Sequence, residues 1–158
     1  MTGVQRVLFR SPLTGAKNRH ALSVDLGVYE NVKNVGVLYC DVLGLKRVND
    51  TQGHQAGDRL LVRAIQCLQE VFRKKEVYRV GGDEFMVVCI GIEEKLFMEK
   101  VEKVRILMQE REALMSIGVI WKEETGNLEA LIGEADEIMY EEKRAYYAVK
   151  GKHVDYRS

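Results

Sequence analysis

The chain has 158 residues, which suits one domain with a substantial core and is too short for two comfortable ones. The 24 lysines and arginines equal the 24 aspartates and glutamates in number, so the chain has no net positive charge that would attract it to nucleic acid or to an anionic membrane. No apolar stretch approaches the roughly 20 residues that span a bilayer, and Cys40, Cys67 and Cys89 sit in apolar segments, which predicts reduced thiols in a cytoplasmic protein.

The first eleven residues, Met1 to Ser11, share no periodicity with the rest of the chain and resemble translated adapter DNA or a cloning scar. A signal peptide is the competing interpretation, but the apolar stretch is short and arginines interrupt it. We therefore expect residues 1–11 to be a non-native leader that marks a truncation, and residues 12–158 to form the domain.

A helical pattern over Arg19 to Lys33 precedes a mostly apolar run from Asn34 to Val42. The run suits a strand buried on both faces, near Val35 to Asp41, and this strand ends on a carboxylate. The segment from Gly44 to Asp50 is short and compatible with a helix, and a turn at residues 52–54 leads into the next helix.

That next helix, predicted over Asp58 to Lys74, carries a strong apolar stripe on one face. Three polar residues nearby have structural explanations as well as functional ones. Asp58 would be only the N-cap of this helix, Asn49 would cap or turn the preceding helix, and His54 would be a satisfied loop histidine.

A second group of residues consists of two apolar flanks, Val77 to Val80 and Phe85 to Ile90, which predict the arms of a β-hairpin. The glycines at residues 81–82 can take positive φ and let a ligand approach the backbone closely. They place the adjacent carboxylates of Asp83 and Glu84 at the tip of the turn, where like charges repel unless a cation offsets them. The pattern suggests a metal site, with a plain hairpin as the alternative.

Later segments predict a helix near Leu96 to Glu112, a strand near Ala113 to Trp121 and a helical segment over Asn127 to Tyr147. The apolar stripe on the last segment is better suited to core packing than to function. A hairpin among helices favours an α+β sandwich, a mainly antiparallel sheet flanked by helices, over a doubly wound parallel sheet.

Taken together, these residues resemble the GGDEF family of diguanylate cyclases. Asp41 to Asp58 is similar to the family pattern Asp-x-x-x-x-Lys-x-x-Asn-Asp-x-x-Gly-His-x-x-Gly-Asp, and Arg79 to Phe85 matches the signature that names the family. Other matching anchors lie toward both ends of the chain: Pro12-Leu-Thr-Gly15, Asn18-Arg19, Met115-Ser-Ile-Gly118, Ala135-Asp136, Met139-Tyr140 and Lys143. The resemblance covers nearly the whole chain.

The resemblance implies the ferredoxin-like palm shared with nucleotidyl cyclases, in which the strand ending at Asp41 lies beside the hairpin. It implies that Asp41, the Val42 carbonyl and Asp83 ligate Mg²⁺, with Mn²⁺ as an alternative, and that Glu84 supports this ion or helps to hold a second one. Asp83 would also be the catalytic residue, as general base for the ribose 3′-hydroxyl.

The resemblance further implies that the substrate is GTP. The residues that would contact it are carried over from the family: Lys46, Asn49, His54, Asp58 and Lys143. Backbone amides around residues 43–46, at the start of a short helix, would bind phosphates, with the two lysines as point charges. Asn49 and Asp58 would read the Watson-Crick edge of guanine, and the carboxylate would discriminate against adenine.

The chain departs from the family at a few positions. Ser11 stands where the family usually has Asp. The family's inhibitory Arg-x-x-Asp is approached only by Arg73 to Glu76, one residue closer to the glycine pair, so we expect that product-binding site to be absent or degenerate. Leu43 replaces an acid or Asn at a position without a ligand role, and either Lys150 or Lys152 would replace a phosphate-binding Arg.

These features predict a diguanylate cyclase that condenses two GTP into cyclic di-GMP and two pyrophosphates. Each chain would hold one GTP, so activity would require a homodimer, and a sensory or dimerisation module would precede this output domain in a longer protein. The expected partners exclude nucleic acid and direct membrane contact. The alternative is a catalytically weak GTP-binding regulatory module that controls a partner domain.

Overall fold

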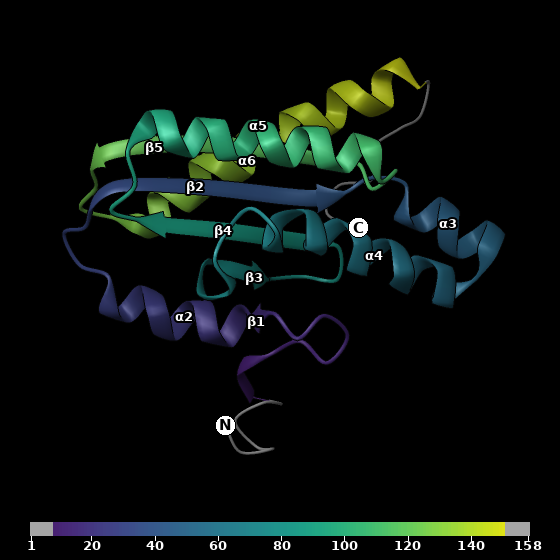
Figure 1. Ribbon diagram of the computed structural model, residues 1–158, viewed down its shortest axis with the longest axis horizontal. Helices are drawn as coiled ribbons and strands as arrows, with labels where there is room; N and C mark the ends of the chain where they lie inside the picture. Colours follow the sequence, from purple (N-terminus) through teal and green to yellow (C-terminus); the bar gives the residue numbers. More distant parts are fainter. Residues whose placement is uncertain (1–7, 151–158) are drawn as a thin grey trace.

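A mixed five-stranded sheet lies at the centre of the protein, in a computed structural model that describes residues 8–150 (Figure 1). The strand order is β1-β3-β4-β2-β5; β1 and β3 are parallel, and the other neighbouring pairs are antiparallel. The elements in chain order are β1 (Lys17–Asn18), α2 (Arg19–Val28), β2 (Lys33–Val42), α3 (Leu45–Gln52), α4 (His54–Gln69), the 3₁₀ turn η1 (Lys74–Glu76), β3 (Val77–Arg79), β4 (Glu84–Ile90), α5 (Glu94–Glu110), β5 (Met115–Glu124) and α6 (Leu128–Val149).

This arrangement confirms the predicted fold class, a mainly antiparallel sheet flanked by helices. The element boundaries differ from the predicted ones at several places. α2 ends at Val28 and not near Lys33, because Tyr29 at the C-cap already has an extended backbone with a ψ of 92°, and Asn31 then takes a left-handed φ of 50°. The two-residue strand β1 was not predicted. No helix among residues 8–150 is long and apolar enough to cross a membrane.

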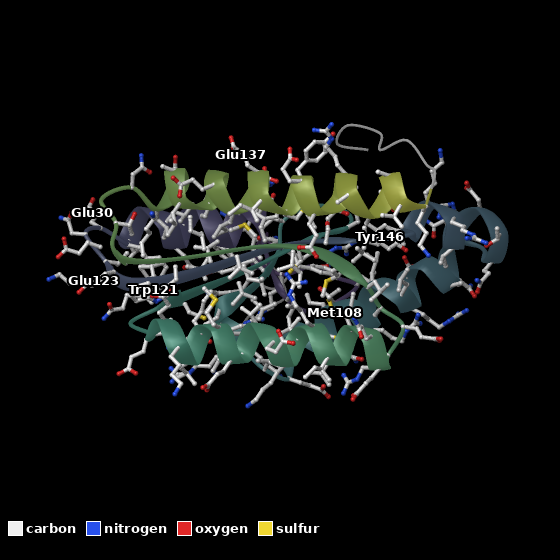
Figure 2. All side chains as sticks on the ribbon, turned by 90° about the horizontal axis from the view of Figure 1, so that it is seen from above. Glu30, Met108, Trp121, Glu123, Glu137 and Tyr146 are labelled. Atoms are coloured by element: carbon white, nitrogen blue, oxygen red, sulfur yellow. The ribbon has the colours of Figure 1, made fainter. Side chains whose placement is uncertain are left out.

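The two faces of the sheet are covered by different pairs of helices. Figure 2 shows α6 on one side of the sheet and α5 on the other. Side chains alternate along β2, so Leu38 and Cys40 join the core beneath α4 and α5, whereas Val37 and Tyr39 join the core beneath α2 and α6. By the same alternation Asp41 belongs to the α6 side, and this decides which helix can reach its carboxylate.

Helix α6 lies unusually close to the sheet at Gly118 of β5. A Cβ atom at this position would lie 1.8 Å from the carbonyl oxygen of Ala135 and 2.6 Å from the amide nitrogen of Met139. Only glycine therefore permits this approach, because a backbone atom cannot give way as the end of a flexible side chain can. The close packing sets the position of everything further along α6.

The described part of the predicted leader, residues 8–11, packs on the domain. The Ser11 amide donates to the Ala16 carbonyl at 2.7 Å, the Ser11 side chain is buried, and the ring of Phe9 lies 5.1 Å from that of His20. Residues 1–7 lie outside the described residues. The foreign origin of the leader stays a prediction, but its last residues contribute to the structure.

Candidate active site

The predicted metal ligands come together where β2 ends beside the β3–β4 turn. Asp41 pairs in register with Glu84 across the antiparallel β2–β4 ladder. The Val42 amide donates to the Asp83 carbonyl at 2.9 Å, which ties the strand end directly to the turn. Figure 1 shows α3 beyond this end of the sheet, on the side toward which β2 points. Two segments separated by some forty residues thus form one edge, as the sequence predicted.

The Gly-Gly turn does not use the backbone conformation that favours glycine. The glycines with positive φ in the described chain are Gly15, Gly44, Gly53 and Gly91, so neither Gly81 nor Gly82 uses the left-handed region. What Gly82 provides is room, because a Cβ atom there would meet no other atom within 4 Å. The room at Gly82 is consistent with close approach of a ligand to the backbone, and neither glycine uses the positive φ that its lack of a side chain permits.

Arg79 holds the turn from the end of β3. Its Nη2 atom donates to the Gly82 carbonyl at 2.8 Å and its Nη1 atom donates to the hydroxyl of Ser11 at 3.0 Å. Burial lowers the pKa of the Arg79 guanidinium, and the charges of Asp58 and Asp83 act against this shift. The charge of Arg79 therefore interacts with both a predicted guanine-reading carboxylate and the predicted catalytic carboxylate.

Asp41 is the most perturbed carboxylate of the site. Its side chain is buried, and its Oδ2 atom accepts a hydrogen bond from Nζ of Lys143 at 3.2 Å. Among the described residues no group hydrogen-bonds its other oxygen, Oδ1, which is also buried. Burial, and after it the charge of Asp83, raise the pKa of Asp41 from its ordinary 3.8 to about 7, although Lys143 opposes both effects.

These residues fit a divalent cation. An unpartnered buried carboxylate oxygen beside two further acids is costly without a positive charge, and a hard cation prefers such oxygen ligands. Within residues 8–150 no three acid, histidine or cysteine side chains form a complete metal site by themselves. This is consistent with Mg²⁺, which keeps waters and takes part of its shell from substrate phosphates. Asp41, the Val42 carbonyl and Asp83 are the groups that would hold it.

The predicted guanine-reading residues lie on α3 and α4. A Cβ atom on Gly57 would lie 1.7 Å from Oδ1 of Asn49, so the Asn49 side chain rests directly on the surface of α4 at this glycine. Asp58, the next residue, is exposed, as are Lys46 on α3 and His54 at the start of α4. The structure thus brings Asn49 and Asp58 to neighbouring positions.

Asp58 is not the N-cap of its helix. Helix α4 begins at His54, with Gly53 at the N-cap and no side-chain cap hydrogen bond, so Asp58 is the fifth helical residue. The helix starts early because Gly53 takes a φ of 91° and breaks α3 from α4 at that point. The structural alternative for Asp58, and the predicted start of this helix, are therefore wrong.

The predicted phosphate-binding amides are only partly open. The Leu43 amide donates to the Leu114 carbonyl at 2.9 Å, and the Gly44 amide donates to the hydroxyl of Tyr147 at 3.0 Å. Leu45 and Lys46 are the first residues of α3, whose opening N–H groups have no acceptor within a helix. The cradle predicted over residues 43–46 is therefore reduced to the amides at the start of α3.

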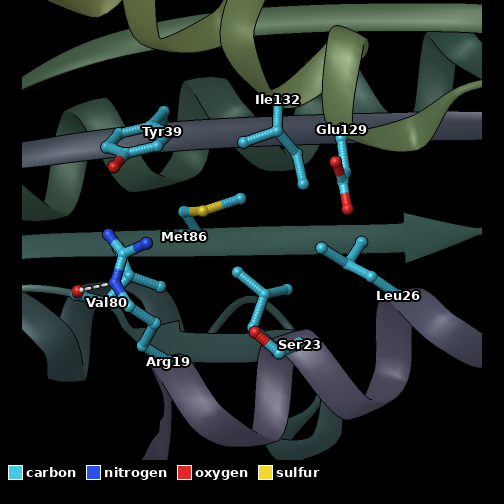
Figure 3. Close-up of a pocket in the computed structure, with 9 residues that line it drawn as sticks. Arg19, Ser23, Leu26, Tyr39, Val80, Met86, Glu129 and Ile132 are labelled. Carbon is cyan, nitrogen blue, oxygen red and sulfur yellow. Dashed lines mark hydrogen bonds between the residues drawn. The ribbon is translucent and has the colours of Figure 1, made fainter.

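Glu84 is held on the α6 side of the sheet by Tyr39, whose hydroxyl donates to Oε1 of Glu84 at 3.2 Å. Burial and the charge of Glu84 raise the pKa of Tyr39, so this hydroxyl stays a donor. Tyr39 also lines a pocket between α2 and α6 (Figure 3), where Arg19 donates from Nε to the Val80 carbonyl at 2.9 Å. None of the lining residues is a predicted site residue: Arg19, Leu22, Ser23, Leu26, Tyr39, Val80, Met86, Glu129 and Ile132.

The remaining expectations concern the chain before β3 and the end of α6. Glu76 accepts a hydrogen bond from the Arg73 backbone amide at 2.9 Å and so is used within its own turn, while the degeneracy of a product-binding site here stays a prediction. Lys150 is exposed, with its Nζ atom 5.6 Å from the ring centre of Tyr146, and Lys152 lies outside the described residues.

Sequence reasoning missed three contributors to the site. It assigned no role to Arg79, although that residue lies inside the quoted signature, and none to Tyr39 or Tyr147. It expected Lys143 at the phosphates, which stays a prediction, and did not foresee the buried ion pair of this lysine with Asp41. A polar residue ending a predicted buried strand could have drawn attention to a buried partner, but no local pattern identifies which helix supplies it.

A family model described as "Diguanylate cyclase, GGDEF domain" matches residues 10–147. The probable diguanylate cyclase DgcI of Escherichia coli K12 is 35% identical over 140 residues, which cover 86% of this chain and 31% of that protein. The diguanylate cyclase VdcA of Vibrio cholerae is 29% identical over 154 residues, which cover 89% of this chain and 45% of that protein. The chain thus spans less than half the length of these relatives.

Solved structures show the same fold. The coiled coil and GGDEF domain of DgcB from Caulobacter crescentus, in complex with c-di-GMP, superposes with a TM-score of 0.78 at 21% identity, covering 90% of this chain and 84% of that one. The GGDEF domain of TpbB, or YfiN, from Pseudomonas aeruginosa gives a TM-score of 0.74 at 26% identity, covering 86% of this chain and 89% of that one.

Proposed function

This chain belongs to the GGDEF family of diguanylate cyclases, and from that premise we propose that it condenses two GTP molecules into cyclic di-GMP and two pyrophosphates. The observation that carries the proposal is the buried Oδ1 atom of Asp41, which has no hydrogen-bond partner among the described residues and lies at a strand end beside Asp83. Burying a carboxylate oxygen without a hydrogen-bond partner costs free energy. A strand end with a purely structural role would therefore not keep the Oδ1 atom of an aspartate buried and unpaired.

In this proposal Asp83 accepts the proton of the ribose 3′-hydroxyl, whose oxygen then attacks the α-phosphorus of the second GTP and displaces pyrophosphate. Mg²⁺, or Mn²⁺, would supply charge neutralisation at the triphosphate and help to lower the pKa of the hydroxyl. Lys143 keeps Asp41 oriented through their ion pair, and Glu84, held by Tyr39, adds negative charge next to the site.

Substrate contacts follow the arrangement of α3 and α4. The amides at the start of α3 and the exposed ammonium of Lys46 suit the phosphates. Asn49 and Asp58 can pair with the Watson-Crick edge of guanine, because a carboxylate accepts from both donors on that edge. His54 begins the helix that carries Asp58 and lies one turn before it, within reach of the same ligand.

Each chain would bind one GTP, so two chains must face each other for both bonds to form. We therefore propose a homodimer as the active unit, brought together in longer relatives by a sensory or dimerisation module. The alternative is a catalytically weak module that binds GTP and regulates a partner domain.

The test is incubation of the purified protein with GTP and Mg²⁺, followed by chromatographic separation of the products. We expect cyclic di-GMP and pyrophosphate from the parent protein and at least a roughly 10³-fold lower rate from Asp83→Ala, a barrier increase of about 4 kcal/mol. Glu123→Ala, at an exposed acid near the far end of β5, is the matched control and should leave the rate unchanged.

Circular dichroism should show that both variants fold. A near-parental rate in Asp83→Ala would remove Asp83 as the base. GTP binding without any product in the parent protein, even at high protein concentration, would favour the regulatory module.

A further inference from the structure

The C-terminal turns of α6 contribute two groups to the edge of the active site. Lys143 contacts Asp41 at the end of β2, and Tyr147, one helical turn later, accepts a hydrogen bond from the Gly44 amide at 3.0 Å. Residues four apart on a helix share a face, so both side chains reach the site from the same side. Of these two residues, the proposed function has used only Lys143.

Gly44 is the last residue before α3. It takes a left-handed φ of 74° and occupies the N-cap of that helix. Its N–H group therefore lies directly beside the first amides of α3, which are the ones proposed to bind phosphates. Because the Tyr147 hydroxyl already accepts from this N–H, a phosphate oxygen cannot use it unless Tyr147 moves away.

The Tyr147 hydroxyl, which accepts a hydrogen bond from the Gly44 N–H, still has its own O–H group as a donor. A tyrosine hydroxyl can accept one hydrogen bond and donate another, and accepting from an amide strengthens its donation. The Tyr147 ring is partly buried, and its position is supported by an edge-on contact with Tyr146, at 5.1 Å between ring centroids. A donor held in this way beside a helix N-terminus is suited to an anionic oxygen.

We propose that Tyr147 is a substrate-positioning residue that links the Gly44 amide to the triphosphate. Its hydroxyl accepts a hydrogen bond from the Gly44 N–H group and donates a hydrogen bond to a phosphate oxygen, and we call this pair of hydrogen bonds the relay. The inference rests on the proposed function for the identity of the anion. It extends the phosphate site beyond the loop after β2 and makes the last turn of α6 part of the substrate-binding surface.

The experiment compares Tyr147→Phe with Tyr146→Phe. Both variants lose a single hydroxyl from neighbouring positions of α6 and keep their rings, but only the Tyr147 hydroxyl contacts Gly44 in the described structure. Isothermal titration calorimetry with Mg²⁺ measures two probes: a GTP analogue with a methylene group between the α- and β-phosphates, and guanosine, which has no phosphate.

We expect Tyr147→Phe to raise the Kd of the triphosphate analogue by about ten- to a hundredfold, as for the loss of one hydrogen bond to a charged group. The Kd of guanosine should not change, and Tyr146→Phe should leave both values at the parental level. Inorganic tripolyphosphate, used as a competitor of the analogue, should show the same loss in Tyr147→Phe, because the relay acts on phosphate alone.

An unchanged or lower Kd for the analogue in a folded Tyr147→Phe would overturn the relay; a lower Kd would show that the hydroxyl blocks the Gly44 amide. Equal weakening of the analogue and guanosine would also overturn it, since the effect would then not be confined to phosphate. Failure of the parent protein to bind the analogue at all would instead remove the proposed function, and with it this assignment.

Discussion

The Nζ atom of Lys143 lies 3.2 Å from Oδ2 of Asp41, and this ion pair joins α6 to the end of β2. The side chains of both residues are less than a tenth exposed, so water screens the pair little. The pair also leaves Oδ1 of Asp41 for a ligand. One lysine thus fixes an acid that the proposed chemistry requires, and this ion pair can be tested.

Replacing Lys143 by Met keeps most of the length of the side chain and removes its charge. Removing one member of a buried pair leaves the other unpaired, so we expect a loss of about 3 kcal/mol in the free energy of unfolding. The pKa of Asp41 is raised to about 7, which means that the folded protein holds this proton more tightly than the unfolded chain does. Ionisation of Asp41 therefore costs stability as pH rises toward 7.

The loss caused by Lys143→Met should accordingly be larger above pH 7, where Asp41 is charged, and smaller below it, where Asp41 is protonated. Urea unfolding with a metal chelator present, on either side of that pH, measures the difference. Lys143→Arg, which keeps the charge, should lose less. An equal loss at both pH values would mean that packing, and not charge, accounts for the effect.

Gly57→Ala should weaken GTP binding without lowering stability. The added Cβ atom would lie 1.7 Å from Oδ1 of Asn49 and must displace that side chain. Alanine is a better helix former than glycine, so α4 itself should not suffer. We expect the Kd for GTP to rise about tenfold, corresponding to roughly one lost hydrogen bond, with an unchanged or higher Tm.

Gly133→Ala in α6 is the matched control for that substitution, because a Cβ atom there would meet nothing within 4 Å. It should raise the Tm and leave GTP binding at the parental level. If Gly57→Ala bound GTP as the parent does, Asn49 would not be a substrate contact in the position described.

Asp58→Ser should relax the choice between GTP and ATP. The carboxylate complements the donor edge of guanine and pairs poorly with adenine, so discrimination should fall by about 1 to 3 kcal/mol. Since Asp58 is exposed and is not the N-cap of α4, we expect little change in Tm. Competition assays with mixed GTP and ATP measure the selectivity. Unchanged selectivity would leave this residue without its proposed role.

Ser11→Asp should stabilise the domain. The Ser11 hydroxyl accepts from Nη1 of Arg79 at 3.0 Å, and a carboxylate there would replace a neutral acceptor with a charged one in a buried position. We expect a gain of about 1 kcal/mol, or about 2 to 4 °C in Tm. Ser11→Asn, whose side chain has the size of aspartate but no charge, should gain less stability. Equal gains from both would point to packing.

Specific activity should rise with protein concentration. Two separate chains must meet by diffusion to join two GTP molecules, whereas tethered chains react at a high effective concentration. Initial rates measured over a wide range of protein concentration test this, and fusion to a parallel coiled coil should raise the rate at low concentration. Constant specific activity in a monodisperse monomer would contradict the proposed dimer.

The elements whose signals are local were predictable from the sequence. The apolar arms on either side of Gly81 and Gly82 form the β3–β4 hairpin, and the apolar stripe after Gly57 forms α4. Residues close in the chain decide these features, because side-chain period and turn propensity act over a few residues. The GGDEF resemblance then placed Asp41 beside Asp83, and the structure agrees that the two strand ends meet.

The partners of the site residues were decided only by tertiary structure. Lys143 meets Asp41 across 102 positions of the chain, Tyr147 meets Gly44 across 103, and Arg79 meets Ser11 across 68. Two of these contacts depend on how closely α6 packs on β5 at Gly118. No local pattern encodes the distance between a helix and a sheet, since this distance results from the packing of whole elements. The sequence by itself therefore determined the acids of the site, and the fold determined which cations and hydrogen-bond donors hold them.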